Sequence, residues 1–207
     1  MLNGDNNMFD LLFAYYIQLL AIMNPFSALP TFLSLTDHLD EIERKDIVRK
    51  AFITSIILVI LFSLIGNYIL LAFGISIASL RIGGGILLLV IALDMLGGMP
   101  RTKQIEYSDI AVVPLATPMV IGPGTITTIL LLTSREPGFL NIFLVLIASI
   151  LAATTTFIML RYSTKLVSIL RVSVIRAIGR FMSLIIASVA VEMIALGIIS
   201  FYHTYFC

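Results

Sequence analysis

The sequence predicts an all-α membrane protein with six transmembrane helices, arranged as two inverted three-helix repeats whose first and fourth helices are broken. Composition is the first reason: 59% of the 207 residues are hydrophobic, 12% are charged, and the mean hydropathy is +1.09. In soluble domains about a quarter of all residues are charged, so the composition indicates a protein embedded in a lipid bilayer. Long charge-free segments and an internal repeat are the second and third reasons.

Six apolar segments define the transmembrane helices. Four of them contain no Asp, Glu, Lys or Arg: 11–36, 51–73, 110–134 and 137–160. Each exceeds the roughly 20 residues that cross the hydrocarbon core. Two more, about 77–98 and 181–202, contain one acid each, Asp94 and Glu192. The connections are too short for another domain, so residues 1–207 form a single membrane domain.

The distribution of basic residues predicts the orientation. Segments 37–50, 99–109 and 161–180 contain eleven of the 13 Lys and Arg residues, and only Arg81 and Arg135 lie elsewhere. Because cytoplasmic loops are enriched in Lys and Arg, these three loops are expected in the cytoplasm and both termini on the opposite, outer side of the membrane. Segment 37–50 is mixed in charge and fits either a short amphipathic helix or a solvated loop.

The second half of the chain repeats the first at an offset of 98 residues. At this offset Asn24-Pro25 aligns with Gly122-Pro123, and Asp94 aligns with Glu192. Repeat one covers about 8–98 and repeat two about 109–202. Each has three helices, an odd number, so the second copy crosses the membrane upside down. Inverted repeats with broken first helices are a recurring plan of secondary transporters, with the ligand site between the repeats.

The proline-containing breaks supply the candidate substrate-binding residues. Proline removes a backbone donor and disturbs the preceding turn, and in lipid the freed carbonyl must be satisfied by protein, water or ligand. A helix that begins at Pro25 or Pro123 directs its positive end into the break, which favours a carboxylate. Simple kinks capped by hydroxyl groups are the alternative. The candidates are Asn24, Pro25, Ser27, Thr31, Gly122, Pro123, Gly124 and Thr125.

Two acids within the apolar segments are candidates for binding a coupling proton or sodium ion. Glu192 lies near the middle of its segment, where a carboxylate costs at least about 2–3 kcal/mol. A neutral acid bonded to a backbone carbonyl is the alternative for Glu192, and contact with the membrane interface is the alternative for Asp94. The glycines of "RIGGGILLL" (81–89) predict close helix packing or a path for substrate.

Other function classes find little support in the sequence. The net charge of +1 does not favour nucleic acid, and one cysteine with two histidines outside the apolar spans predicts no metal site or cofactor. The chain contains neither HExxH nor GxSxG, so an enzyme is not expected.

Four stretches carry a resemblance to a known family: "NPFSALPTF", "FGISIASLRIGGGILLL", "VPLATPMVIGPGTITT" and "GRFMSLIIASVAVEMIALGI". Together they resemble the MarC family of bacterial inner-membrane proteins over nearly the whole chain. The resemblance implies a six-helix transporter of neutral amino acids such as alanine and glycine, with periplasmic termini. An acid at the positions of Asp94 and Glu192 is not implied by this resemblance.

The sequence therefore predicts a secondary transporter of small neutral amino acids, of the alanine, glycine or serine type, coupled to protons or sodium ions. Its expected partners are the solute, the coupling ion and the lipid bilayer, and a homo-oligomer is compatible with the sequence. An exporter of another small polar metabolite and a non-transporting membrane scaffold are the alternatives. A scaffold would tolerate bulky residues at the breaks.

Overall fold

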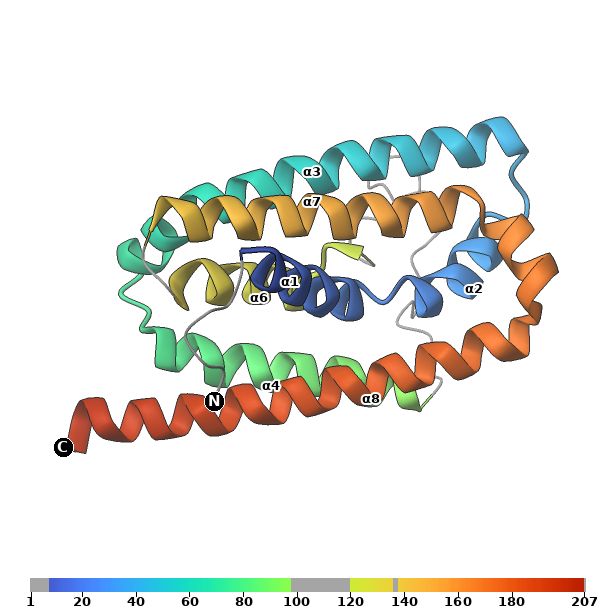
Figure 1. The fold of residues 1–207 in the computed structure, drawn as a ribbon. Helices are drawn as coiled ribbons and strands as arrows, with labels where there is room; N and C mark the ends of the chain where they lie inside the picture. The colour runs from blue at the N-terminus through green and yellow to red at the C-terminus, as the bar shows by residue number, and fades with distance from the viewer. Residues whose placement is uncertain (1–7, 98–119, 136–137, 207) are drawn as a thin grey trace.

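The computed structural model describes residues 8–97, 120–135 and 138–206 of the chain, and these residues are helical with no strand among them. The all-α prediction is therefore confirmed for the described part. Figure 1 shows the helices, which are α1 (Met8–Met23), α2 (Pro25–Leu35), α3 (Glu41–Ala72), α4 (Ile77–Leu96), α6 (Pro123–Arg135), α7 (Phe139–Arg161) and α8 (Ser163–Phe206).

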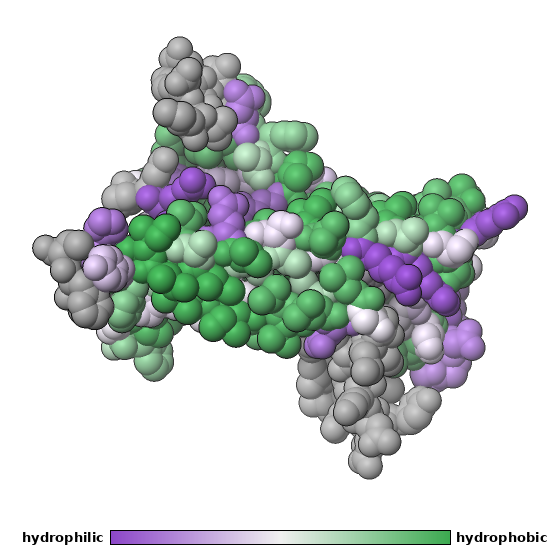
Figure 2. Space-filling model, turned by 90° about the horizontal axis from the view of Figure 1, so that it is seen from below, coloured by the Kyte–Doolittle hydropathy of each residue, from purple (hydrophilic) through white to green (hydrophobic). Residues whose placement is uncertain are grey.

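Five helical segments are long and apolar enough to cross a membrane, so the chain is an integral multi-pass membrane protein. They are Met8–Leu35, which comprises α1 and α2, Glu41–Ala72, Ile77–Leu96, Phe139–Arg161 and Ser163–Thr204. The sixth predicted span, 110–134, lies partly outside the described residues, and α6 is its described portion. The face shown in Figure 2 has a broad hydrophobic area across its middle, as expected of a surface that meets lipid.

The helices are arranged in three layers (Figure 1). α3 and α7 pack side by side in one outer layer, α4 and α8 in the other, and α1, α2 and α6 lie between them. The core between these layers includes Leu19 and Leu29 of the middle layer and Val145 of α7, all fully buried. The middle layer is therefore enclosed by protein on two sides, which suits helices with irregular backbone.

Segment 37–50 is helical from Glu41 onward and continues directly into the apolar part of α3. Asp40 begins the helix: its side chain accepts the N–H of Ile42 and Glu43 at 2.8 and 2.7 Å, and Glu43 returns a bond to the Asp40 N–H at 3.1 Å. This reciprocal capping satisfies donors at the helix start. The segment is therefore helical from Glu41 rather than a solvated loop, but it is the first part of the 32-residue α3 and not a separate short helix.

The prediction that 161–180 is a loop is wrong, because α8 begins at Ser163 and includes this segment. The helix is interrupted only at Arg171, whose φ of 56° and ψ of 144° are not helical. Ser163–Leu170 forms a first short portion, and the rest of α8 crosses the molecule beside α4. Charge alone marked this segment as lying outside the membrane, and charged residues are also common on exposed helices.

The ends of the described helices fall into two groups. The start of α1 and the end of α8 lie toward one end of the molecule, and the start of α3 and the junction of α7 with α8 lie at the other (Figure 1). The predicted loop 99–109 lies outside the described residues.

Glycines bring α4 and α8 close together, as the "RIGGGILLL" stretch predicted. A Cβ atom on Gly85 would lie 2.8 Å from the backbone oxygen of Ala190, and one on Gly197 would lie 2.7 Å from Cγ1 of Ile82. Neither position has room for a side chain while the backbones keep this distance.

Candidate functional site

The first predicted break is present at Asn24, between the end of α1 at Met23 and the start of α2 at Pro25. Proline has no N–H and disfavours right-handed helical geometry in the residue before it. Asn24 accordingly adopts the left-handed conformation, with φ of 43° and ψ of 66°. Asparagine is one of the few residues that tolerate this conformation. Pro30, by contrast, lies within α2 without interrupting it.

The Asn24 side chain is fully buried and joins three helices at the break. Its Oδ1 accepts the N–H of Ser27 at 3.3 Å and so caps α2. Its Nδ2 donates to the backbone oxygen of Gly179 in α8 at 3.4 Å and lies 3.7 Å from Sδ of Met95 in α4. A Cβ on Gly179 would lie 2.7 Å from Oγ of Ser27. The break is thus held by protein contacts to both helices of the α4–α8 layer.

The second predicted break lies before Pro123, where α6 begins at the position equivalent to Pro25. Thr125 is buried and donates from Oγ1 to the backbone oxygen of Val120 at 3.0 Å, across the break. A Cβ on Gly124 would lie 2.7 Å from Cδ2 of Leu88, so the start of α6 packs closely on α4. Pro114 and Pro118 lie outside the described residues.

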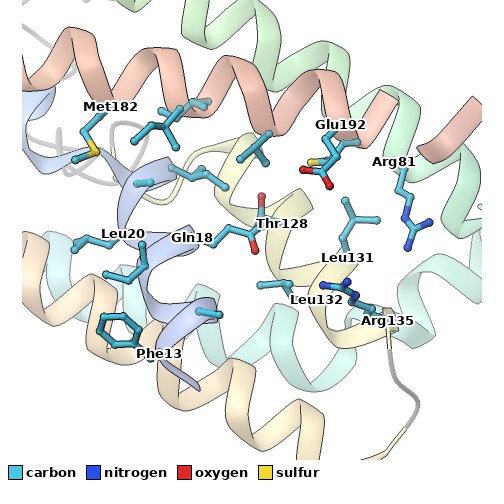
Figure 3. A pocket seen from close by; sticks show the side chains of 18 of the residues that line it. Phe13, Gln18, Leu20, Arg81, Thr128, Leu131, Leu132, Arg135, Met182 and Glu192 are labelled. Atoms are coloured by element: carbon cyan, nitrogen blue, oxygen red, sulfur yellow. The ribbon is translucent and has the colours of Figure 1, made fainter. Parts of the chain in front are cut away.

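A cavity of about 610 Å³ lies among α1, α2, α6 and α8, with one residue contributed by α4 (Figure 3). Its walls are mainly aliphatic and aromatic. Five polar side chains interrupt them: Gln18 of α1, Arg81 of α4, Thr128 and Arg135 of α6, and Glu192 of α8. Few polar groups in an apolar cavity of this size are typical of sites for small molecules.

The polar groups form two sets within this cavity (Figure 3). Gln18 extends from α1 toward Thr128 of α6, whose Oγ1 donates to the backbone oxygen of Gly124 at 2.9 Å. Glu192, Arg81 and Arg135 lie around another part of the cavity, with Leu131 between Glu192 and Arg135 in this view.

The charged groups of the cavity are largely free to meet a ligand. Nη1 of Arg81 donates to Oγ of Ser200 at 3.4 Å. Among the described residues, no salt bridge involves Glu192 or Arg135, so the charges of these two side chains are not neutralised by a direct pair. A cavity with separate positive and negative groups can bind a solute that carries both charges.

The structure brings only part of the predicted site to this cavity. Pro25 and Glu192 line it. Asp94 is exposed near the end of α4 and does not line it. The other predicted residues also lie off its walls: Asn24, Ser27, Thr31, Gly122, Pro123, Gly124 and Thr125. Among the described residues, no cluster of three His, Cys, Asp or Glu side chains could hold a metal ion.

Three residues of the cavity were not selected from the sequence, although the sequence contains a feature that singles out each of them. Arg81 and Arg135 are the two basic residues outside the three basic segments, and both line the same cavity. Gln18 is one of two amide side chains, with Asn24, in the first charge-free segment. Polar residues that contradict the surrounding pattern in a membrane protein are candidates for function.

Residues 9–202 match the family described as MarC family integral membrane protein. The chain belongs to the MarC family. It is 35% identical over 191 residues to the UPF0056 membrane protein MJ1677 of Methanocaldococcus jannaschii, covering 88% of this chain and 93% of that protein. It is also 35% identical over 201 residues to the UPF0056 membrane protein YvbG of Bacillus subtilis, covering 92% and 95%.

A third relative of this MarC protein is the UPF0056 membrane protein PYRAB13050 of Pyrococcus abyssi, 35% identical over 189 residues, with 88% of this chain and 92% of that protein covered. No solved structure matches the chain. The MarC match spans both breaks and every polar residue of the cavity, so these features lie within the shared part of the sequence.

Proposed function

We propose that this MarC protein is a secondary transporter of small neutral amino acids, such as alanine, glycine or serine, and is not an enzyme. The cavity lined by Gln18, Arg81, Thr128, Arg135 and Glu192 is the observation that carries the proposal. It combines separate cationic and anionic groups with apolar walls, inside a membrane protein whose helices break beside it.

The chemistry of the cavity suits a zwitterion. In the proposed mode, Arg81 and Arg135 bind the carboxylate through charge-assisted hydrogen bonds, and Glu192 binds the ammonium group. Gln18 supplies a further donor and acceptor. The aliphatic walls favour a small uncharged side chain, because a charged one would lose its hydration without a partner.

The packing of the helices supports the proposed inverted repeat. Exchanging the two repeats would exchange α2 with α6, α3 with α7, and α4 with α8. Under this exchange the α3–α7 and α4–α8 contacts map onto themselves, and the α2–α8 contact maps onto the α4–α6 contact; all four are present. Related repeats that move relative to one another are the usual basis of alternating access.

Glu192 is the proposed site for the coupling proton or sodium ion. It is the acid that lines the cavity, whereas its sequence equivalent Asp94 does not. Protonation or ion binding at Glu192 would change the charge that the ammonium group meets, and would thereby link ion and solute binding. The periplasmic placement of the termini in a bacterial inner membrane, and a homo-oligomeric assembly, remain part of this proposal.

Uptake and counterflow of labelled alanine, glycine and serine by purified protein in proteoliposomes test the function. We expect counterflow that does not need a gradient, and net uptake driven by an imposed proton or sodium gradient. Glu192→Gln should abolish gradient-driven uptake, and Asp94→Asn, which removes an acid outside the cavity, should leave it intact.

The same assay separates the proposal from its alternatives. Counterflow of none of the three amino acids would reject them as substrates, and would leave an exporter of another polar metabolite or a membrane scaffold. Loss of transport in both acid variants, or in Asp94→Asn alone, would reject the assignment of Glu192.

A further inference from the structure

A second cavity, of about 600 Å³, lies where the start of α3 meets the junction of α7 and α8. This is the end of the molecule away from the start of α1 and the end of α8 (Figure 1). It shares no lining residue with the cavity that contains Glu192. Its walls carry four basic side chains, Arg44, Lys45, Arg161 and Lys165, and one acid, Glu41.

The charge of this basic cavity is only partly compensated. Glu41 pairs with Lys45, with 2.6 Å between Oε1 and Nζ. Among the described residues, neither Arg161 nor Lys165 has a carboxylate partner, and both side chains are exposed at the cavity. Three unpaired cations around one hollow attract an anion.

Arg44 lines the basic cavity, and two hydrogen bonds fix its guanidinium group. Its Nη2 donates to the backbone oxygen of Thr36 at 2.8 Å, and its Nη1 donates to Oγ1 of Thr164 at 3.3 Å. Its Nε is buried and has no hydrogen-bond partner among the described residues. A guanidinium fixed in this way loses little entropy when it binds an anion.

The start of α8 adds backbone donors beside the same cavity. The turn at Tyr162 ends α7, and the first helical bond of α8 joins the N–H of Leu166 to the oxygen of Tyr162 at 2.9 Å. Ser163, Thr164 and Lys165 precede this bond at the start of α8, and the first N–H groups of a helix have no acceptor within that helix. Helix starts with free N–H groups favour phosphate.

An apolar stripe on α7 leads away from the basic cavity. Leu151 and Ile158 are exposed by 46% and 53%, and their spacing of seven residues places them on one face of α7. Tyr162, exposed by 55%, follows the last residue of α7. Acyl chains can pack along such a stripe while the headgroup occupies the cavity. A soluble phosphate compound would make no use of it.

We propose that the basic cavity binds the phosphodiester headgroup of an anionic phospholipid, with its acyl chains along the exposed face of α7. Arg161 and Lys165 are the headgroup contacts, and Arg44 is the fixed guanidinium beneath them. Basic pockets between transmembrane helices are known to bind anionic headgroups. The lipid anchors the α3–α7 layer to the junction at which α8 begins.

Native mass spectrometry of the full chain in detergent tests the proposal, with dioleoyl phosphatidylglycerol and dioleoyl phosphatidylcholine as probes. We expect retained phosphatidylglycerol adducts in preference to phosphatidylcholine. The double variant Arg161→Gln/Lys165→Gln should bind phosphatidylglycerol about thirtyfold more weakly, since each basic residue near an anionic lipid contributes about a factor of five. The matched control Arg49→Gln/Arg176→Gln removes the same charge from exposed residues outside the cavity and should bind like the unaltered protein.

Two results would overturn this assignment. Equal loss of binding in the control variant would show general attraction to a basic surface in place of a site. Displacement of the lipid by millimolar inorganic phosphate would assign the cavity to a soluble phosphate compound. Because the variants and the readout do not involve amino acid transport, failure here is distinguishable from failure of the proposed transport function.

Discussion

Asn24 offers the most direct test of how the first break is stabilised. Its left-handed backbone and its two side-chain hydrogen bonds are separate contributions, and substitutions can separate them. Asn24→Gly keeps the backbone conformation accessible but removes the side chain. Asn24→Ala removes the side chain and also places a Cβ in the left-handed conformation, which costs about 1–2 kcal/mol.

The structure sets the size of each effect. Loss of the cap to the Ser27 N–H costs about 1 kcal/mol on substitution by alanine and a few tenths by glycine. Loss of the bond from Nδ2 to Gly179 costs about 0.6 kcal/mol, the average for hydrogen bonds between membrane helices. The Gly179 oxygen keeps a bond from Oγ of Ser183 at 2.9 Å, so no buried acceptor is orphaned. These contributions add up, so we expect Asn24→Ala to destabilise by about 2.6–3.6 kcal/mol and Asn24→Gly by about 1 kcal/mol.

Thermal unfolding in detergent, followed by circular dichroism because the chain has no tryptophan, measures these differences. One kcal/mol corresponds to roughly 2–4 °C in the midpoint for a chain of this size. The alanine variant should therefore melt about 3–10 °C below the glycine variant. An alanine variant as stable as the glycine variant, or more stable, would refute the contribution assigned to the left-handed conformation.

Three further substitutions test the close packing of α4 and α8, a buried hydrogen-bond network and the non-helical backbone at Arg171. Gly85→Ala should destabilise by about 1–3 kcal/mol in the same assay, because its Cβ would lie 2.8 Å from the Ala190 oxygen. The matched control is Gly83→Ala, whose Cβ meets nothing within 4 Å and which should be neutral or slightly stabilising. Equal losses of stability in the two variants would contradict the close α4–α8 crossing. Tyr15→Phe should cost about 1 kcal/mol by removing the buried 2.9 Å bond from its hydroxyl to Oδ1 of Asn141, which itself donates to the Leu132 oxygen at 2.8 Å. A smaller loss for Tyr15→Phe than for Tyr16→Phe, whose hydroxyl bond to Thr155 is only partly buried, would argue against that network. Arg171→Gly should raise the unfolding midpoint by the equivalent of about 1 kcal/mol, since φ of 56° with ψ of 144° is strained for any residue with a Cβ. Arg171→Ala, which keeps a Cβ, should not raise the midpoint. An equal rise in both variants would assign the effect to the loss of the Arg171 charge.

The first break shows how far the sequence predicts local structure. Asn24-Pro25 predicts an interruption because the chemistry that causes it lies within two residues: proline lacks an N–H and restricts the residue before it. The capping box at Asp40 and Glu43 is local in the same way. The error at 161–180 has the opposite origin. Basic residues report which side of the membrane a segment occupies, and they do not report whether it is helical.

The candidate site was only partly predictable because its residues are assembled by packing. Glu192 could be selected from its own segment, since an acid in an apolar helix is costly wherever it lies. Gln18, Arg81 and Arg135 share a cavity with Glu192 only because α1, α4, α6 and α8 pack together, although these residues lie 57 to 174 positions from Glu192 in the sequence. No local pattern encodes such contacts.

The sequence by itself determined the membrane environment, the six apolar segments, the sorting of basic residues and the positions of the two breaks, because each depends on composition or on neighbouring residues. Only the tertiary structure decided which polar groups share a cavity, and it distinguished two acids that the repeat makes equivalent. Glu192 lines the cavity and Asp94 lies outside it. The physical reason is that a transmembrane helix exposes different faces to lipid and to protein, and the neighbours that cover each face are set by helix packing.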